Sequence, residues 1–214
     1  RERFCDNNPE RAMEKILQTE HLGDVHKKIC LPMNPIVLRG NMPRKARIDA
    51  PGALQHIIVR GIERRKIFND DEDRDNFLDR LGGVLTDTGT PCFAWALIPN
   101  HAHLLVKTGV TPIATVMRRL LTGYAVSFNR RHRRHGQLFQ NRYKSILCQE
   151  DSYLLELVRY IHLNPLRAKL VEDLKDLDSF SYGGHSVMMG KREQSWQDAD
   201  YILKFYAPGR VSAR

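Results

Sequence analysis

The sequence lacks the features of a membrane protein or an exported protein. No apolar run approaches the ~20 residues that a membrane-spanning helix needs, and the N-terminus carries no secretory signal. The four cysteines form no C-x-x-C pair, and there is no zinc-finger, basic-zipper or RRM signature. We therefore expect a cytoplasmic protein with reduced thiols, in which Cys92 and Cys148 pack inside strands.

Acidic residues are missing from the middle of the chain. No Asp or Glu lies between Thr88 and Gln149, and the 214-residue chain has a formal net charge of +9 and a pI near 9.6. A basic surface of uniform sign suits a polyanion, nucleic acid before a membrane, although a run of charge is often only a solvated face. Phe139 and Tyr143 interleave with the cations and could stack on unpaired bases. The cations that we predict to contact nucleic acid are Arg118, Arg119, Arg130, Arg131, Arg133, Arg134, Arg142 and Lys144.

Hydrophobic periodicity predicts the order of the secondary structure. A hydrophobic fraction of 42% supports a core of domain size. Strands are predicted over residues 54–60, 92–98, 101–107 and 142–149. Helices are predicted over residues 70–88, from Thr111 as N-cap to a stop at Gly136, and from a cap at Asp151-Ser152 to Pro165. The order is that of the ferredoxin-like α+β fold (βαββαβ), an antiparallel sheet with helices on one face, followed here by one more helix.

The composition divides the chain into three parts. Residues 42–165 hold the predicted domain, and Met42-Pro43-Arg44 looks like the start of a protein. Residues 1–41 fit poorly with the rest, and we interpret them as upstream read-through or a flexible leader. Residues 166–214 are looser, with a short helix predicted over residues 197–206, and we interpret them as a C-terminal extension that has been cut short.

Two histidines lie where a strand pair turns back. Side chains alternate faces along a strand, so His101 and His103 point to one face while Ala102 and Leu104 point to the other. Two imidazoles side by side make half of a divalent-metal site. Taken alone, a His-x-His pair at a strand edge is more often hydrogen-bonded and inert.

A tyrosine and an amide lie on the last predicted helix of the domain. Tyr160 and Asn164 are four residues apart and share a helix face, while His162 points elsewhere. A phenol and an amide opposite two histidines would suit cleavage of a phosphodiester, with a metal polarising the phosphate and the phenolate attacking it. The alternative is that Tyr160 is an amphipathic residue at the boundary of the core.

Four segments together resemble a known family. They are Asn100-His101-Ala102-His103-Leu104-Leu105, Phe128-Asn129-Arg130-Arg131, Leu138-Phe139-Gln140-Asn141-Arg142-Tyr143 and Tyr160-Ile161-His162-Leu163-Asn164-Pro165. The chain resembles the HUH single-tyrosine transposases over about residues 42–182, and their REP-associated tyrosine transposase branch in particular.

The resemblance implies a chemistry and roles for four residues. It implies single-stranded, hairpin-associated DNA as the substrate, a Mg²⁺ or Mn²⁺ ion and a covalent 5′-phosphotyrosine intermediate. By motif position, His101, His103 and Asn164 would bind the metal and Tyr160 would be the nucleophile. It also makes a homodimer an expectation, and a location with the bacterial nucleoid.

Three functions remain open at this point. The first is a metal-dependent DNA nicking and strand-transfer enzyme, and every residue that it needs is present. The second is a catalytically inactive DNA-binding or regulatory derivative of the same fold. The third is a metal-dependent phosphodiesterase that forms no covalent intermediate and in which Tyr160 only positions the substrate.

Overall fold

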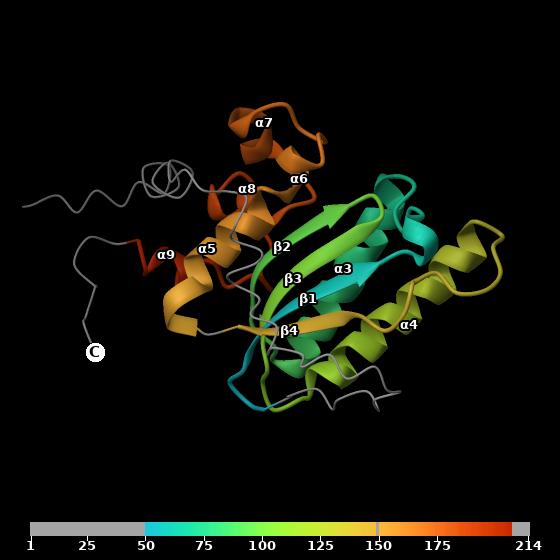
Figure 1. The fold of residues 1–214 in the computed structure, drawn as a ribbon, viewed down its shortest axis with the longest axis horizontal. Helices are drawn as coiled ribbons and strands as arrows, with labels where there is room; N and C mark the ends of the chain where they lie inside the picture. Colours follow the sequence, from blue (N-terminus) through green and yellow to red (C-terminus); the bar gives the residue numbers. More distant parts are fainter. Residues whose placement is uncertain (1–49, 149, 207–214) are drawn as a thin grey trace, which may run out of the picture.

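A four-stranded antiparallel sheet forms the centre of the protein (Figure 1). The computed structural model describes residues 50–148 and 150–206, so the predicted leader lies outside the described residues. The strands are β1 (Leu54–Arg60), β2 (Cys92–Ile98), β3 (His101–Lys107) and β4 (Lys144–Cys148), in the spatial order β2-β3-β1-β4. This order and the antiparallel pairing of neighbours confirm the predicted ferredoxin-like α+β class.

Two long helices cover one face of the sheet. They are α3 (Asp71–Thr88) and α4 (Ile113–Arg131), which lie together behind the sheet in Figure 1. Their apolar stripes pack on Ile57, Leu104 and the other strand residues of that face. A short 3-10 helix, η1 (Ile62–Arg64), follows β1. Gly82 of α3 is explained by packing, because a Cβ there would lie 2.6 Å from Trp196 Cδ1.

The opposite face of the sheet packs on α5 (Glu150–His162). Leu157, Val158 and Ile161 of α5 are buried against strand residues such as Leu105. Strand alternation puts His103 on the same face as Leu105. Helix α5 is the additional helix that was predicted after the ferredoxin-like elements, and it covers the histidine side of the sheet. It begins at Glu150, before the predicted Asp151-Ser152 cap.

The C-terminal region covers the outer edge of β2. It consists of short helices, α6 (Asn164–Arg167), α7 (Leu174–Ser179), α8 (Gly184–Met188) and α9 (Ala199–Leu203). The Leu97 N–H donates to the Tyr182 carbonyl (2.9 Å), and the Asp198 N–H donates to the Cys92 carbonyl (2.8 Å). The indole N–H of Trp95, which is buried, donates to Gln197 Oε1 at 2.7 Å. An exposed strand edge invites pairing with another chain, and these contacts block the β2 edge.

The end of α4 differs from the prediction. The helix begins after Pro112, which is its N-cap in place of Thr111, and it ends at Arg131. Arg133 takes a left-handed conformation (φ 48), and the Arg134 N–H donates to the Asn129 carbonyl at 2.8 Å. This is a Schellman turn with arginine at the position that glycine usually occupies, so the helix stops before Gly136.

The described helices include none that is both long and apolar enough to cross a membrane. Cys92 and Cys148 are buried free thiols in β2 and β4, where they were predicted to pack. Burial raises the pKa of the Cys92 thiol to about 12, because the thiolate would lose its solvation.

The Trp95–Gln197 hydrogen bond gives a test of how firmly the C-terminal region is held. Gln197→Ala should lower the free energy of unfolding by about 1–3 kcal/mol, because it leaves a buried indole N–H without its acceptor. Urea unfolding followed by tryptophan fluorescence measures the change. Gln140→Ala, at a side chain outside the core, is the control and should change little. Equal stability of the two variants would contradict this role of the hydrogen bond.

Candidate active site

Three histidines meet on the face of the sheet that packs against α5. His101 and His103 follow one another on the same face of β3, with their ring centroids 5.0 Å apart. His56 of β1 stacks on His103 at 5.1 Å, and its Nε2 lies 2.9 Å from His103 Nδ1. His56 is fully buried. Sequence patterns did not single it out, and only the pairing of β1 with β3 brings it to the site.

The hydrogen bond of His101 fixes which of its ring nitrogens carries the proton. The Nδ1–H of His101 donates to Asn100 Oδ1 at 2.7 Å, because an amide oxygen can only accept. His103 Nδ1 lies 2.9 Å from His56 Nε2, so one of these two nitrogens donates to the other. The His101 tautomer places the lone pair of that ring on Nε2, the nitrogen that a metal would use.

The charge state of His101 also suits a metal ligand. Burial, and to a smaller extent the positive charge of Arg60, lower the pKa of His101 to about 4. The imidazole is therefore neutral at pH 7, as metal coordination requires.

Tyr160 is in direct contact with the histidines. Its ring stands edge-on to His103 at 5.9 Å and to His56 at 6.1 Å. The structure thus brings together Tyr160 and the histidine pair from segments that are far apart in the sequence. Arg167 of α6 completes this side, with its guanidinium carbon 4.9 Å above the Tyr160 ring.

Asn164 sits where α5 gives way to α6. Its amide nitrogen donates to the carbonyls of Tyr160 (2.9 Å) and Ile161 (3.3 Å), which closes the C-terminal end of α5. The nitrogen is therefore used within the helix, and Oδ1 is the atom that Asn164 can offer to a cation. Arg167 could have been found from the sequence, because positions 160, 164 and 167 follow the i, i+4, i+7 spacing of one helix face.

The candidate set of metal donors contains no acidic side chain. Among the described residues, no three His, Cys, Asp or Glu side chains are arranged to hold a metal ion. A site here would consist of Nε2 of His101, Nε2 of His103 and Oδ1 of Asn164. All three are neutral donors, and the His101 tautomer and the Asn164 hydrogen bonds fit that use.

His162 lies outside this group, as its position on the helix predicts. It is fully buried beside His185, at a ring distance of 5.8 Å, and burial holds the pKa of His162 well below its usual range. The Nε2 of His185 lies 2.7 Å from Asp178 Oδ1. These residues support the junction of α5 with the C-terminal region.

The structure separates the predicted DNA-binding cations into two groups. Lys144 pairs with Ile58 on β1, and Ile58 pairs with His103, so Lys144 is on the histidine face of the sheet. Arg60, which no sequence pattern singled out, pairs with His101 on that face. The second group lies on or just after α4, on the other side of the sheet: Arg118, Arg119, Arg130, Arg131, Arg133 and Arg134. Arg142 is exposed and precedes β4.

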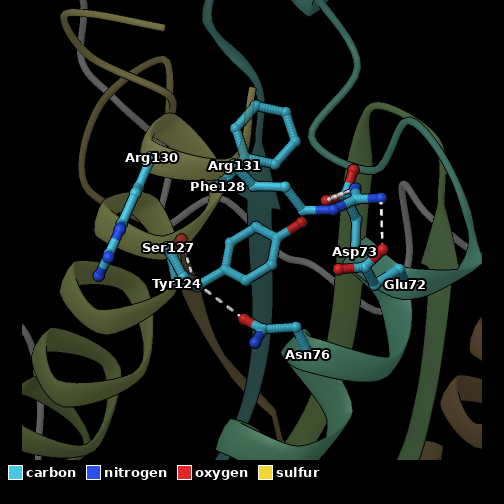
Figure 2. Close-up of a pocket in the computed structure, with 8 residues that line it drawn as sticks. All are labelled: Glu72, Asp73, Asn76, Tyr124, Ser127, Phe128, Arg130 and Arg131. Carbon is cyan, nitrogen blue, oxygen red and sulfur yellow. Dashed lines mark hydrogen bonds and ion pairs between the residues drawn. The ribbon is translucent and has the colours of Figure 1, made fainter. Parts of the chain in front are cut away.

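Arg131 is committed to carboxylates of α3 and its N-cap. Its guanidinium contacts Asp70 (2.9 Å), Glu72 (2.7 Å) and the buried Asp73 (2.7 Å), and the Asp70 hydrogen bond raises the pKa of Arg131 above its usual range. Figure 2 shows this network beside a pocket between α3 and α4, with Arg130 pointing away from the carboxylates. The network argues against the predicted DNA contact of Arg131.

Other contacts and the burial of side chains also bear on the predicted nucleic-acid contacts. Arg119 is exposed and pairs with Asp87 at 2.7 Å. Tyr143 is buried and Phe139 packs against the core, which argues against base stacking by either ring. Arg118, Arg130 and Arg133 are exposed on the α4 side, and Arg134 is half-buried.

Comparison with known proteins gives the family. The model of the family "Transposase IS200 like" matches residues 52–164, more than half of the chain. No curated protein sequence matches. Among solved structures, a REP-associated tyrosine transposase bound to a REP hairpin is similar, with a TM-score of 0.56 and 16% identity over 73% of this chain and 98% of that one. A candidate transposase from Deinococcus radiodurans is more distant, with a TM-score of 0.39 and 21% identity over 56% of this chain and 95% of that one. The family match includes both histidines, Tyr160 and Asn164, and the chain therefore belongs to the IS200-like transposase family.

Proposed function

We propose that the protein nicks and rejoins single-stranded, hairpin-associated DNA through a 5′-phosphotyrosine at Tyr160, with a divalent metal. The observation that carries this proposal is the contact of the Tyr160 ring with His103 and His56. A tyrosine that only packed at the boundary of the core would have no need to lie against a cluster of histidines. The motifs and the similar fold of a REP-associated tyrosine transposase support placing the protein in that branch.

We assign the metal site to His101, His103 and Asn164, with Mg²⁺ or Mn²⁺ as the ion. When bound, the ion supplies Lewis-acid polarisation of the scissile phosphate. Because all three donors are neutral, they leave the full positive charge to act on that phosphate. Asn100 holds the His101 imidazole in the required tautomer, and His56 is the hydrogen-bond partner of the His103 imidazole.

Tyr160 is the nucleophile in this proposal. Its phenolic oxygen attacks the phosphorus, the Tyr160 O–P bond forms and the P–O3′ bond breaks. The phenol loses its proton, and the leaving 3′ oxygen gains one. The phosphodiester energy is kept in the phosphotyrosine bond, so the 3′ hydroxyl can reverse the step on another strand without an external energy source.

Positive charge near the ring helps the phenol to react. A free tyrosine has a pKa near ~10 and is mostly protonated at neutral pH. The guanidinium of Arg167 lies 4.9 Å above the ring, and we assign it the role of offsetting negative charge that develops during the attack. A guanidinium uses its face to contact a ring and its in-plane N–H groups to bind a phosphate, so Arg167 can also hold the scissile group.

Cations flank the histidine face where the DNA would lie. Arg60 and Lys144 are exposed on this face, on the two strands next to each other, and Arg167 is exposed on α6. The similar solved structure is bound to a hairpin, which supports a hairpin partner here. A homodimer would need a surface other than the β2 edge, because residues 182–198 already cover that edge. A cytoplasmic, nucleoid-associated location follows from the DNA partner.

The two other functions predict different products. An inactive regulatory derivative would bind DNA and leave it intact. A phosphodiesterase that uses a water nucleophile would cut DNA in the presence of metal without a covalent adduct. Both alternatives also keep Tyr160 beside the histidines, so the products of the reaction are what separates the three functions.

The first test is the covalent adduct. Incubation with a hairpin oligonucleotide and Mg²⁺ or Mn²⁺, followed by digestion and mass spectrometry, should map a nucleotide to Tyr160. Tyr160→Phe should bind the DNA normally and form no adduct, because it keeps the ring and loses the oxygen nucleophile. Tyr153→Phe, two turns earlier on the same helix, should still form it. An adduct on another tyrosine, or cleavage by the Tyr160→Phe protein, would contradict the assignment.

The metal ligands are tested by binding as well as by activity. His101→Ala should abolish cleavage and weaken Mn²⁺ binding, measured by electron paramagnetic resonance, because it removes one of three donors. Its melting temperature in metal-free buffer should stay close to that of the parent. His135→Ala, at an exposed histidine, should leave both cleavage and metal binding unchanged. A large loss of stability in His101→Ala without any change in Mn²⁺ affinity would favour a structural role for the pair.

The basic end of α4 gives a third test. Replacing Arg130 and Arg133 with Ala should weaken DNA binding and reduce the salt dependence of log K by roughly 0.7 for each single-strand phosphate that the variant no longer neutralises. Arg131→Ala should instead lower the melting temperature and leave the salt slope unchanged, because its carboxylate contacts join α4 to α3. Fluorescence anisotropy over a range of salt concentrations measures the slope. If only Arg131→Ala flattens the slope, Arg131 contacts DNA after all.

A further inference from the structure

A basic pocket lies on the α4 side of the sheet, near the end where β3 begins. It has a volume of about 200 Å³. Its polar lining comes from two segments: Arg65, Lys66 and Asn69 after β1, and His132 and Arg134 after α4. Phe128 and Leu138 form its apolar part. We call this cavity the loop pocket. The sequence contains the basic run Arg64-Arg65-Lys66, and the proposed metal and tyrosine chemistry does not use it.

The loop pocket is joined to the candidate metal site through Asn100. The Oδ1 of this residue accepts from His101, and its Nδ2 donates to the Arg64 carbonyl at 3.2 Å. The Ile67 and Phe68 N–H groups donate to the Pro99 carbonyl at 2.8 and 3.1 Å. The segment that lines the pocket is therefore fixed to the same turn that positions His101.

The charges of the loop pocket favour an anion. Arg134 is held in place, because its guanidinium donates to the Gln137 carbonyl (2.9 Å) and to Asn129 Oδ1 (3.3 Å). Arg65 forms an ion pair with Glu63, and both side chains are about two-thirds exposed, so an incoming phosphate can displace that contact at little cost. Lys66 is exposed at the mouth.

The nearby acidic cluster does not cancel this charge. The residues Asp70, Glu72 and Asp73 do not line the loop pocket, and Arg131 contacts the carboxylates of all three. His132 Nε2 also lies 2.9 Å from Asp73. A ligand in the pocket therefore meets the charges of Arg65, Lys66 and Arg134, together with the exposed Glu63 carboxylate that pairs with Arg65.

We propose that the loop pocket binds a backbone phosphate of the substrate DNA strand, next to the strand segment held at the metal site. The strand would pass around the His101 end of β3, over Asn100, and place one phosphodiester between Lys66 and Arg134. The apolar side formed by Phe128 and Leu138 suits the deoxyribose of that nucleotide. This inference rests on the proposed function and adds to it a second, non-reacting phosphate site that fixes the register of the strand.

The test is a phosphate scan combined with a pocket variant. A series of hairpin oligonucleotides carries a single neutral methylphosphonate at successive positions on either side of the cleavage site. Each is titrated by fluorescence anisotropy against the full chain carrying Tyr160→Phe, which cannot cut. The same series is titrated against the protein that also carries Lys66→Gln and Arg134→Gln. Lys175→Gln, at an exposed lysine of α7, is the matched control for loss of a charge.

One position should stand out in the scan. In the Tyr160→Phe protein with an intact pocket, methylphosphonate at that position should weaken binding by roughly five- to twentyfold, as expected for loss of charge-assisted hydrogen bonds. In the pocket variant, the same change should weaken binding by less than about twofold. The control variant should keep the full effect. Lys66→Gln alone should reduce the effect in part, which guards against a change of loop structure caused by Arg134→Gln.

The outcomes separate this inference from the proposed function. The same methylphosphonate profile in the parent and in the pocket variant would overturn the pocket as a DNA phosphate site. Competition by inorganic phosphate that depends on Lys66 and Arg134, together with an unchanged profile, would show a small-anion site and also overturn it. Failure of the proposed function would appear separately, as the absence of a Tyr160 adduct with the unmodified oligonucleotide.

Discussion

The antiparallel register of β1 with β3 is the constraint on which the candidate site depends. It pairs Ile58 with His103 and Arg60 with His101, and it brings His56 to the hydrogen bond with His103. A shift of the register by one residue would turn a whole strand over, because side chains alternate with period two. The histidines would then face the core of α3 and α4. The buried apolar residues on both faces of these strands prevent such a shift, so the stability of the fold and the geometry of the site have the same origin.

The two faces of the sheet hold different groups of candidate functional residues. The α5 side holds the histidines, Tyr160 and Arg167, and the junction of α5 with α6 positions Asn164 through its hydrogen bonds to two backbone carbonyls. The α4 side carries most of the basic residues predicted to contact DNA. Asn100 links the two sides, because one side chain contacts both His101 and the backbone of the Arg64 loop. A DNA strand that used both sides would have to cross this turn.

Local patterns in the sequence predicted the elements well, and their ends less well. Strands β1, β2 and β3 have the predicted bounds, because each is an apolar run between clear turn residues. The predicted end of α4 at Gly136 was wrong, because an arginine, Arg133, takes the left-handed position that glycine usually occupies in a Schellman turn. The region after residue 165 was expected to be loose. Its contacts with β2 could not be predicted, because Gln197 bonds to Trp95 across 102 residues of chain.

The amino-acid order alone placed His101 and His103 on one strand face and Tyr160 with Asn164 on one helix face, since both periodicities are local properties of the backbone. The sequence could not show that this strand face and this helix face pack against each other. It also missed His56, which reaches His103 across 47 residues, and it gave no sign of the carboxylates near the start of α3 that bind Arg131. These features depend on strand pairing and helix packing between distant segments. A side chain's partner there is set by the fold as a whole, because burial and charge are properties of the assembled neighbourhood and not of the residue type.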